Sequence, residues 1–294
     1  MSAVASTGSL YPQSLKHGAL FLIGAASVFS VVSLLVKALL SDLPVAMVVF
    51  FRNAGGFIFL LPLVLARRSL TLKTYRIGDH SVRALSGVLA MYCFFFAIAR
   101  LPLAEAVTLN FTSPLLIPIL AYAVLREAIT RRIAGLLALG FCGALLIIKP
   151  GFSDLPIGAL AGLLSALFAA FALVNIRKLA STEPAFRIVF YFALIGSLIS
   201  LPPMLFMWKT PDLFQAALLA GVGAGATLGQ WLLTRGYASA PAGQIGYFQY
   251  SAVVFAGLMD WWLWHESPDL ASVIGMVIIC AAGIAASRQG PISG

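Results

Sequence analysis

Long apolar runs separated by short polar segments fill the sequence from residue 18 to residue 287. A transmembrane helix needs about 20 mostly apolar residues, and ten of these runs have that length. They form two sets of five: 18–40, 44–66, 82–100, 103–125 and 132–148, then 156–176, 187–208, 213–238, 243–264 and 269–287. This pattern predicts an all-α integral membrane protein with ten transmembrane helices.

The fourth run is the most polar of the spans, because Asn110 lies in its first half and Pro114 interrupts its middle. A proline leaves a backbone carbonyl without its helical partner, and lipid offers no substitute. We therefore expect this helix to face a protein-lined cavity. The layout returns 139 residues later in the ninth run, where Gln249 takes the place of Asn110.

The two sets of five runs repeat one another at an offset of 139 or 140 residues. Matched positions include Lys37 with Arg177, Pro62 with Pro202, Tyr92 with Trp231 and Gly143 with Gly283. Because five is odd, the second copy enters the membrane from the opposite side, which predicts two inverted five-helix repeats, a recurring build for secondary transporters. The expected divisions are a cytoplasmic N-terminal segment 1–17, a first repeat 18–149, a second repeat 150–288 and a cytoplasmic tail 289–294.

Composition and charge agree with a membrane protein. Hydrophobic residues make up 61% of the chain, charged residues only 10%, and the mean hydropathy is +1.00. The net charge of +9 raises the possibility of nucleic acid as a partner, but most of the 19 Lys and Arg fall in alternate loops. The positive-inside rule explains that distribution, so we expect cytoplasmic termini, a multi-pass protein of the bacterial inner membrane and no nucleic-acid partner.

Motifs for enzymatic chemistry are missing from the sequence. The three cysteines, Cys93, Cys142 and Cys280, lie inside apolar runs with neither disulfide nor metal spacing. No phosphate-binding loop, dinucleotide motif or zinc-protease motif occurs. We therefore predict no cofactor, no metal and no enzymatic activity. The alternative of another class, a membrane-embedded enzyme or lipid-handling protein, would require clustered acids or histidines at one membrane face.

The segment 97–148 carries a recognisable combination of features: a Leu-Pro-Leu-Ala-Glu-Ala entry, mid-span prolines, an Arg-Glu exit and a Gly-rich following helix. It resembles the EamA module of the drug/metabolite transporter superfamily. The second copy, ending at Glu266, and Arg52 in the second span fit the same pattern. The aromatic-rich second half is most similar to the aromatic amino-acid exporters of the YddG type.

This resemblance implies an inner-membrane exporter of small metabolites that works by alternating access, with spans 1, 3, 4, 6, 8 and 9 around the cavity. It implies amino acids as cargo, aromatic or large neutral ones first. An exporter of drugs or nucleotide-linked metabolites is the alternative, although a phosphate-bearing cargo would want several Lys or Arg in the cavity and the sequence offers few. Monomer and homodimer remain open, and membrane lipids are the other expected partners.

Amide and aromatic side chains at membrane depth are the candidate substrate ligands. Amides are disfavoured against lipid, so they point either into a lumen or toward another helix. Aromatic rings beside them would hold a flat apolar group while hydrogen bonds take an amino or carboxyl group. The predicted substrate-binding residues are Tyr92, Phe96, Asn110, Pro114, Asn175, Gln230, Trp231, Tyr247 and Gln249.

Charged residues in or near the spans are predicted to act in gating or structure: Lys37, Arg52, Glu127, Asp260 and Glu266. Arg52 would cost about 2.5–3.5 kcal/mol facing the bilayer centre, so it needs a polar partner. A structural link to a loop carbonyl or carboxylate is favoured for it over binding a substrate carboxylate. No acid lies near the midplane, which leaves facilitated export open beside proton coupling.

Overall fold

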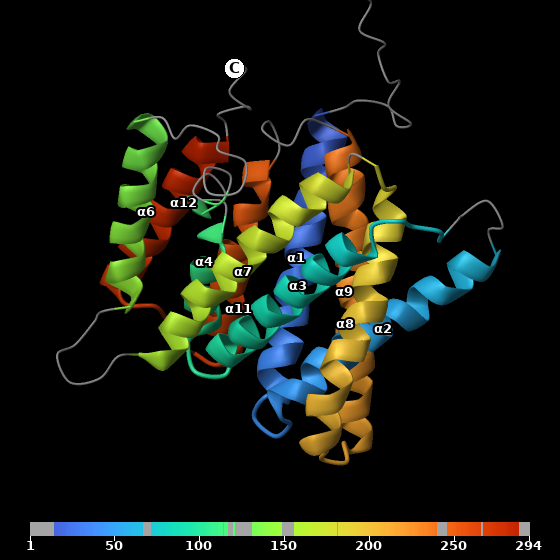
Figure 1. Ribbon diagram of the computed structural model, residues 1–294. Helices are drawn as coiled ribbons and strands as arrows, with labels where there is room; N and C mark the ends of the chain where they lie inside the picture. Colours follow the sequence, from blue (N-terminus) through green and yellow to red (C-terminus); the bar gives the residue numbers. More distant parts are fainter. Residues whose placement is uncertain are drawn as a thin grey trace, which may run out of the picture.

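The computed structural model is α-helical throughout its described residues, which are 15–66, 72–113, 115–116, 120, 131–148, 156–180, 182–239, 246–265 and 267–287 (Figure 1). The first half contains α1 (Leu15–Leu39), α2 (Val45–Ala66), α3 (Ile77–Ile98), α4 (Leu103–Asn110) and α6 (Arg131–Ile148). The second contains α7 (Ile157–Ala180), α8 (Ala185–Phe206), α9 (Leu213–Ser239), the 3-10 helix η1 (Gly246–Tyr250), α11 (Ser251–Leu263) and α12 (Leu270–Ser287). Each predicted apolar run contains a described helix.

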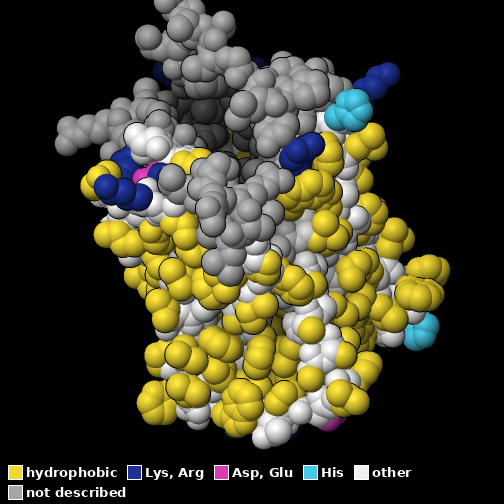
Figure 2. Space-filling view, turned by 90° about the vertical axis from the view of Figure 1, so that its right-hand side faces the viewer, with side chains coloured by type: hydrophobic (Ala, Val, Ile, Leu, Met, Phe, Trp, Pro, Cys, Tyr) yellow, Lys and Arg dark blue, Asp and Glu magenta, His cyan; other side chains and the backbone are white. Residues whose placement is uncertain are grey.

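Six of the described helices are long and apolar enough to cross a membrane, by length and composition, and α6 and α12 contain shorter apolar segments. Large apolar side chains such as Leu198, Val254 and Val277 point outward and are exposed. The face in Figure 2 is mostly hydrophobic, and its visible Lys and Arg side chains gather toward one end. A lipid environment accounts for both features, and a helix satisfies its own backbone hydrogen bonds there.

The fourth run is not a continuous helix in the described residues, since α4 ends at Asn110. Asn110 lies four residues before Pro114, whose missing N–H and bulky ring disrupt the helical hydrogen bond to the carbonyl at that distance. The ninth run is also divided, because η1 precedes α11. The fourth run, expected to be interrupted near Pro114, therefore already leaves the α-helix after Asn110, and the ninth run, predicted as one span, is divided.

Helix contacts between the halves are reciprocal. Helix α1 packs on α9 as α3 packs on α7, α2 contacts α9 as α3 contacts α8, and α1 contacts α11 as α4 contacts α7. The pairs α2 with α8, α4 with α11 and α6 with α12 join equivalent helices. A two-fold relation between the halves generates this pattern. In Figure 1, α1 and α7 run in opposite directions, and α1 begins on the side where α12 ends, as inverted repeats require.

Glycines permit the closest of these crossings. A Cβ added at Gly55 of α2 would overlap the backbone of Gly223 in α9, and one added at Gly275 of α12 would overlap the backbone of Gly143 in α6. Small residues let membrane helices approach in this way.

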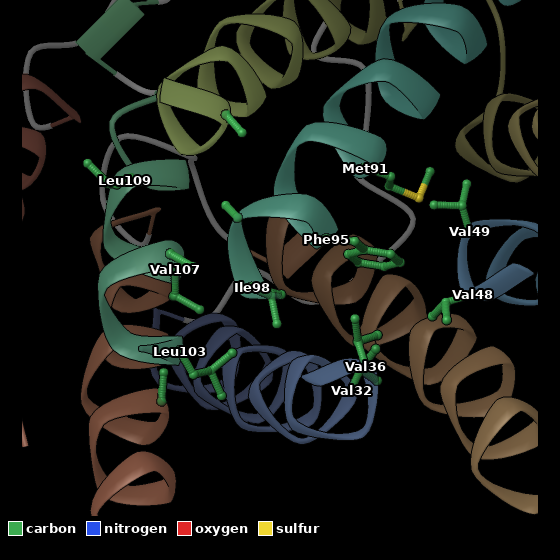
Figure 3. Close-up of a cluster of buried hydrophobic side chains, with 14 of the residues drawn as sticks. Val32, Val36, Val48, Val49, Met91, Phe95, Ile98, Leu103, Val107 and Leu109 are labelled. Atoms are coloured by element: carbon green, nitrogen blue, oxygen red, sulfur yellow. The ribbon is translucent and has the colours of Figure 1, made fainter. Parts of the chain in front are cut away.

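The buried core links the first four helices to the second half. Figure 3 shows Val32 and Val36 of α1 near Phe95 of α3 and Met91 of α3 near Val49 of α2, with Val107 of α4 in the same cluster. These side chains belong to one buried cluster that extends into α8, α9, α11 and α12. The core therefore holds in place the helices that surround the site described next.

Candidate functional site

A cavity of about 240 Å³ lies between the two halves. Its wall comes from α1, α2, α3 and α4 of the first half and from α9, η1 and α11 of the second. The aromatic part of the wall is Phe29, Phe94, Phe95 and Phe111. The polar part is Ser30, Ser33, Arg52, Asn110 and Gln249. A concave, mostly apolar space with a few polar groups is the usual form of a small-molecule site.

Asn110 and Gln249 occupy equivalent positions in the two halves, and both lie in the cavity wall. The Asn110 amide nitrogen donates to Ser165 Oγ at 2.9 Å, and the Ser165 hydroxyl donates to the Gly162 carbonyl at 2.6 Å. This chain to α7 fixes the orientation of the Asn110 side chain. The position of these two amides follows from the helix breaks beside them, at the end of α4 and at η1.

Arg52 lies in the walls of two cavities, the central one and a smaller one of about 30 Å³. Its Nη1 donates to Asn53 Oδ1 at 3.2 Å, and its guanidinium carbon lies 5.6 Å from the ring centre of Phe192 on α8. Within the described parts of the chain, neither a carboxylate nor a backbone carbonyl accepts a hydrogen bond from Arg52. The favoured structural link to a loop carbonyl or carboxylate is therefore not seen there.

The remaining predicted substrate ligands are scattered. Gln230 lines the smaller cavity beside Arg52. Tyr92 and Phe96 are half-buried on α3 but do not line either cavity. The Arg100 guanidinium carbon lies 3.5 Å from the ring centre of Phe96. Trp231 is 52% exposed and packs edge-on against Phe21.

Asn175 also lies away from both cavities and donates to the Phe171 carbonyl at 3.0 Å within α7. Pro114, Glu127, Glu266 and the side chain of Tyr247 lie outside the described residues. The structure thus brings Asn110, Gln249, Arg52 and Gln230 to the cavities and leaves Tyr92, Phe96, Asn175 and Trp231 outside their walls.

Lys37 and Asp260 form an ion pair of 3.0 Å between α1 and α11. The second Asp260 oxygen accepts the N–H of Ala104, in the first turn of α4, at 2.7 Å. The Lys37 ammonium also lies 4.4 Å from the ring centre of Trp264. Because Asp260 is fully buried, this arrangement firmly joins the C-terminal ends of α1 and α11 to the first turn of α4.

Several cavity residues are absent from the sequence-based list. Ser30 and Ser33 share one face of α1 with Ala26, and a search for small and polar residues at helical spacing would have found that face. Arg83 lines neither cavity, and the positive-inside pattern places it among the cytoplasmic charges, but its side chain turns inward, with the guanidinium carbon 4.0 Å from the Phe192 ring centre. Nothing in the sequence signals that turn.

Comparison with known proteins identifies the family and agrees with this fold. The profile of the EamA-like transporter family matches twice, over residues 16–149 and 156–287. A solved crystal structure superposes with a TM-score of 0.66 at 19% identity, covering 93% of this chain and 98% of the other, which shows a shared fold.

Two relatives carry functional names. The chain is 37% identical over 276 residues to the pseudopaline exporter CntI of Pseudomonas aeruginosa (strain UCBPP-PA14), covering 93% of this chain and 97% of that protein. It is 30% identical over 236 residues to an S-adenosylmethionine uptake transporter of Rickettsia bellii (strain RML369-C), covering 80% and 81%. Neither is named as a YddG-type aromatic amino-acid exporter, so the finer resemblance gains no support from them. The chain belongs to the EamA-like transporter family and is a multi-pass membrane transporter.

Proposed function

We propose that the protein exports a small carboxylate-bearing metabolite, with amino acids as the first class to test, by alternating access between its two halves. The observation that carries this proposal is the cavity at the interface of the halves, with Asn110 and Gln249 facing it from equivalent positions and Arg52 in its wall. A site shared by two inverted halves is the arrangement in which rocking of one half exposes cargo to each side in turn.

The wall supplies the interactions that such a cargo needs. A guanidinium such as that of Arg52 binds a carboxylate with two parallel hydrogen bonds, while amides take an amino group or a further oxygen. The rings of Phe29, Phe94 and Phe95 supply an apolar surface for the rest of the molecule.

Movement between the two access states requires the bonds at one end of the bundle to open. Two such bonds join helices of the two halves at the end of the bundle where α1 and α11 finish and α4 and α12 begin. Lys37 pairs with Asp260, and the Ser272 hydroxyl donates to Glu105 Oε1 at 2.7 Å. The breaks at the end of α4 and between η1 and α11 are the points where these helices bend with least loss of hydrogen bonding.

The named relatives support a small organic cargo, since one exports pseudopaline and another takes up S-adenosylmethionine. Export is proposed because the exporter aligns over 97% of its own length at the higher identity. The second candidate is export of a larger metabolite or drug. The same two relatives support this alternative, because neither is named as a transporter of simple amino acids. Membership of a transporter family counts against the membrane enzyme.

Counterflow of radiolabelled amino acids into liposomes containing only this protein tests the proposal. Uptake without an imposed pH gradient would establish a facilitative carrier, and a strict need for the gradient would establish coupling. Asn110→Ala and Gln249→Ala should each reduce the rate severalfold, whereas Gln215→Ala, an amide on α9 away from the cavities, should not. Absence of flux for every amino acid would reject the amino-acid cargo and leave the family assignment standing.

A further inference from the structure

Two arginines lie over a single aromatic ring next to the central cavity, and an asparagine shares the wall of the smaller cavity with that ring. Arg52 and Asn53 come from α2, Arg83 comes from α3, and the ring is that of Phe192 on α8. The guanidinium carbons of Arg83 and Arg52 lie 4.0 and 5.6 Å from the ring centre. The smaller cavity, bounded by Arg52, Asn53 and Phe192, adjoins this group of residues.

Gly87 leaves the space that Arg83 occupies. One turn along α3 from Arg83, a Cβ added at Gly87 would strike both Arg83 Nη1 and the edge of the Phe192 ring. The guanidinium therefore folds back over its own helix and lies on the ring. This inward position is built into the packing of α3 against α8.

The group contains hydrogen-bond donors but almost no acceptors. Nε and Nη1 of Arg83 and Nδ2 of Asn53 are buried, and none of them has a hydrogen-bond partner in the described residues. The one side-chain acceptor, Asn53 Oδ1, already accepts from Arg52. Buried polar groups nearly always have partners, so three unsatisfied donors on neighbouring side chains indicate a missing acceptor.

Among the described residues, no carboxylate forms an ion pair with Arg52 or Arg83, and Glu105 accepts a hydrogen bond from Ser272. Asp79 pairs with Arg76 and Lys178, and Asp260 pairs with Lys37. Glu183 pairs with Arg187. An uncompensated cation away from water is strongly unfavourable, and here there are two within reach of one ring. The acceptor that suits them is an anion that enters from outside.

We propose that Arg52, Arg83 and Asn53 form an anion subsite that receives an acidic group of the cargo. The inference rests on the proposed function and deepens it: the cargo carries a net negative charge, with one acidic group more than a neutral amino acid. The sequence offered few cations for such a cargo, but the inward turn of Arg83 places a second one beside Arg52. Carboxylate and phosphate share the required chemistry, because the negatively charged oxygens of either group can accept hydrogen bonds from several N–H groups at once.

Thermal unfolding of the full-length protein in neutral detergent tests the subsite without any assumption about transport. Succinate and inorganic phosphate are the probes, against sodium chloride at matched ionic strength. The unfolding temperature should rise with at least one probe, because a ligand that binds only the folded state stabilises it. Arg83→Met should lower the binding affinity for that probe by about tenfold or more, which is the loss expected for a charge-assisted hydrogen bond. Arg100→Met, which removes an exposed arginine that also lies on a phenylalanine ring, should not change it.

Counterflow with matched pairs then tests the charge of the cargo. L-Glutamate should be exchanged faster than L-glutamine, and L-aspartate faster than L-asparagine, with Arg83→Met bringing each ratio toward one. No stabilisation by either probe, or stabilisation unchanged in Arg83→Met, would overturn the subsite even if amino acids are transported. Stabilisation by anionic phospholipid alone would make this a lipid-headgroup site and overturn the cargo assignment. Binding of the probes without flux of any amino acid would reject the amino-acid cargo and keep the subsite.

Discussion

Tyr250 of η1 and Phe111, its equivalent in the first half, contact each other across the interface of the two halves. The Tyr250 hydroxyl donates to the Phe111 carbonyl at 3.3 Å, and the two ring centres lie 5.4 Å apart. The Phe111 carbonyl follows the end of α4, where the regular hydrogen-bond ladder stops. The break in one half is therefore satisfied by a side chain at the break in the other, directly beside the amides of the cavity.

Gly283 of α12 makes this contact sensitive to one methyl group. A Cβ there would fall on the Tyr250 hydroxyl, so Gly283→Ala should displace the tyrosine and lower the free energy of unfolding by about 1–3 kcal/mol, as overpacked sites do. The matched control is Gly135→Ala on α6, where a Cβ meets nothing within 4 Å. That variant should be unchanged or slightly more stable, because alanine favours helix. Thermal unfolding in detergent measures both, and an unchanged Gly283→Ala would contradict the described contact.

The ion pair of Lys37 and Asp260 gives a second prediction. Lys37→Met leaves a fully buried carboxylate without its cation, and such a loss costs about 3–5 kcal/mol. Asp260→Asn should cost less, since an amide oxygen can still accept the Ala104 N–H. The double variant should be more stable than the sum of the two single losses predicts, which a double-mutant cycle measures. Simple additivity would show that the two side chains do not interact.

Hydropathy predicted the helix positions well because contact with lipid is its direct physical cause. The expected spans 44–66 and 213–238 compare with α2 at Val45–Ala66 and α9 at Leu213–Ser239. The cavity position of Asn110 and Gln249 was predictable for the same reason, as amides at membrane depth avoid lipid. Hydropathy gave the ninth run as a single span, because it averages over the backbone break between η1 and α11, whereas the proline in the fourth run did signal an interruption.

Rotamers and long-range pairings account for what the sequence did not reveal. Arg83 fits the positive-inside pattern whether its side chain points to water or onto Phe192, so its inward turn is invisible in loop charge. Trp231 was predicted to line the cavity but is exposed, because lipid accommodates an aromatic ring as well as a cavity does. The pairing of Lys37 with Asp260, separated by 223 residues, depends on how the two halves dock.

Glu183, in the loop between α7 and α8, predicts how stability depends on pH. Burial alone would raise its pKa, but hydrogen bonds from Thr74 and Arg187 outweigh that effect and hold the pKa below its ordinary value. A carboxyl with a lowered folded-state pKa contributes stability above its unfolded-state pKa, and that stability is lost as the pH falls through the folded-state pKa. Unfolding temperatures between pH 7 and pH values of about 3 should show this loss in the parent protein.

Glu183→Gln removes the titrating group, so its unfolding temperature should be lower at pH 7 and fall less steeply toward acid. The exposed carboxylate of Asp212 provides the control, and Asp212→Asn should keep the parent slope. If the unfolding temperature fell equally steeply toward low pH in the parent and in Glu183→Gln, another carboxyl group would be responsible for the loss of stability in acid.

Arg83→Met separates a binding role from a structural one in the absence of any ligand. If the guanidinium were a structural element, its removal would lower the unfolding temperature. An uncompensated buried cation instead opposes folding, and an apolar side chain of similar length fills the same niche between Gly87 and Phe192. We therefore expect ligand-free Arg83→Met to unfold at a higher temperature than the parent, the trade of stability against function that binding sites commonly show. Arg83→Lys, which keeps the charge, should not be stabilised in this way. A lower unfolding temperature for Arg83→Met than for the parent would assign the arginine to the packing of α3 on α8 and remove it from the anion subsite.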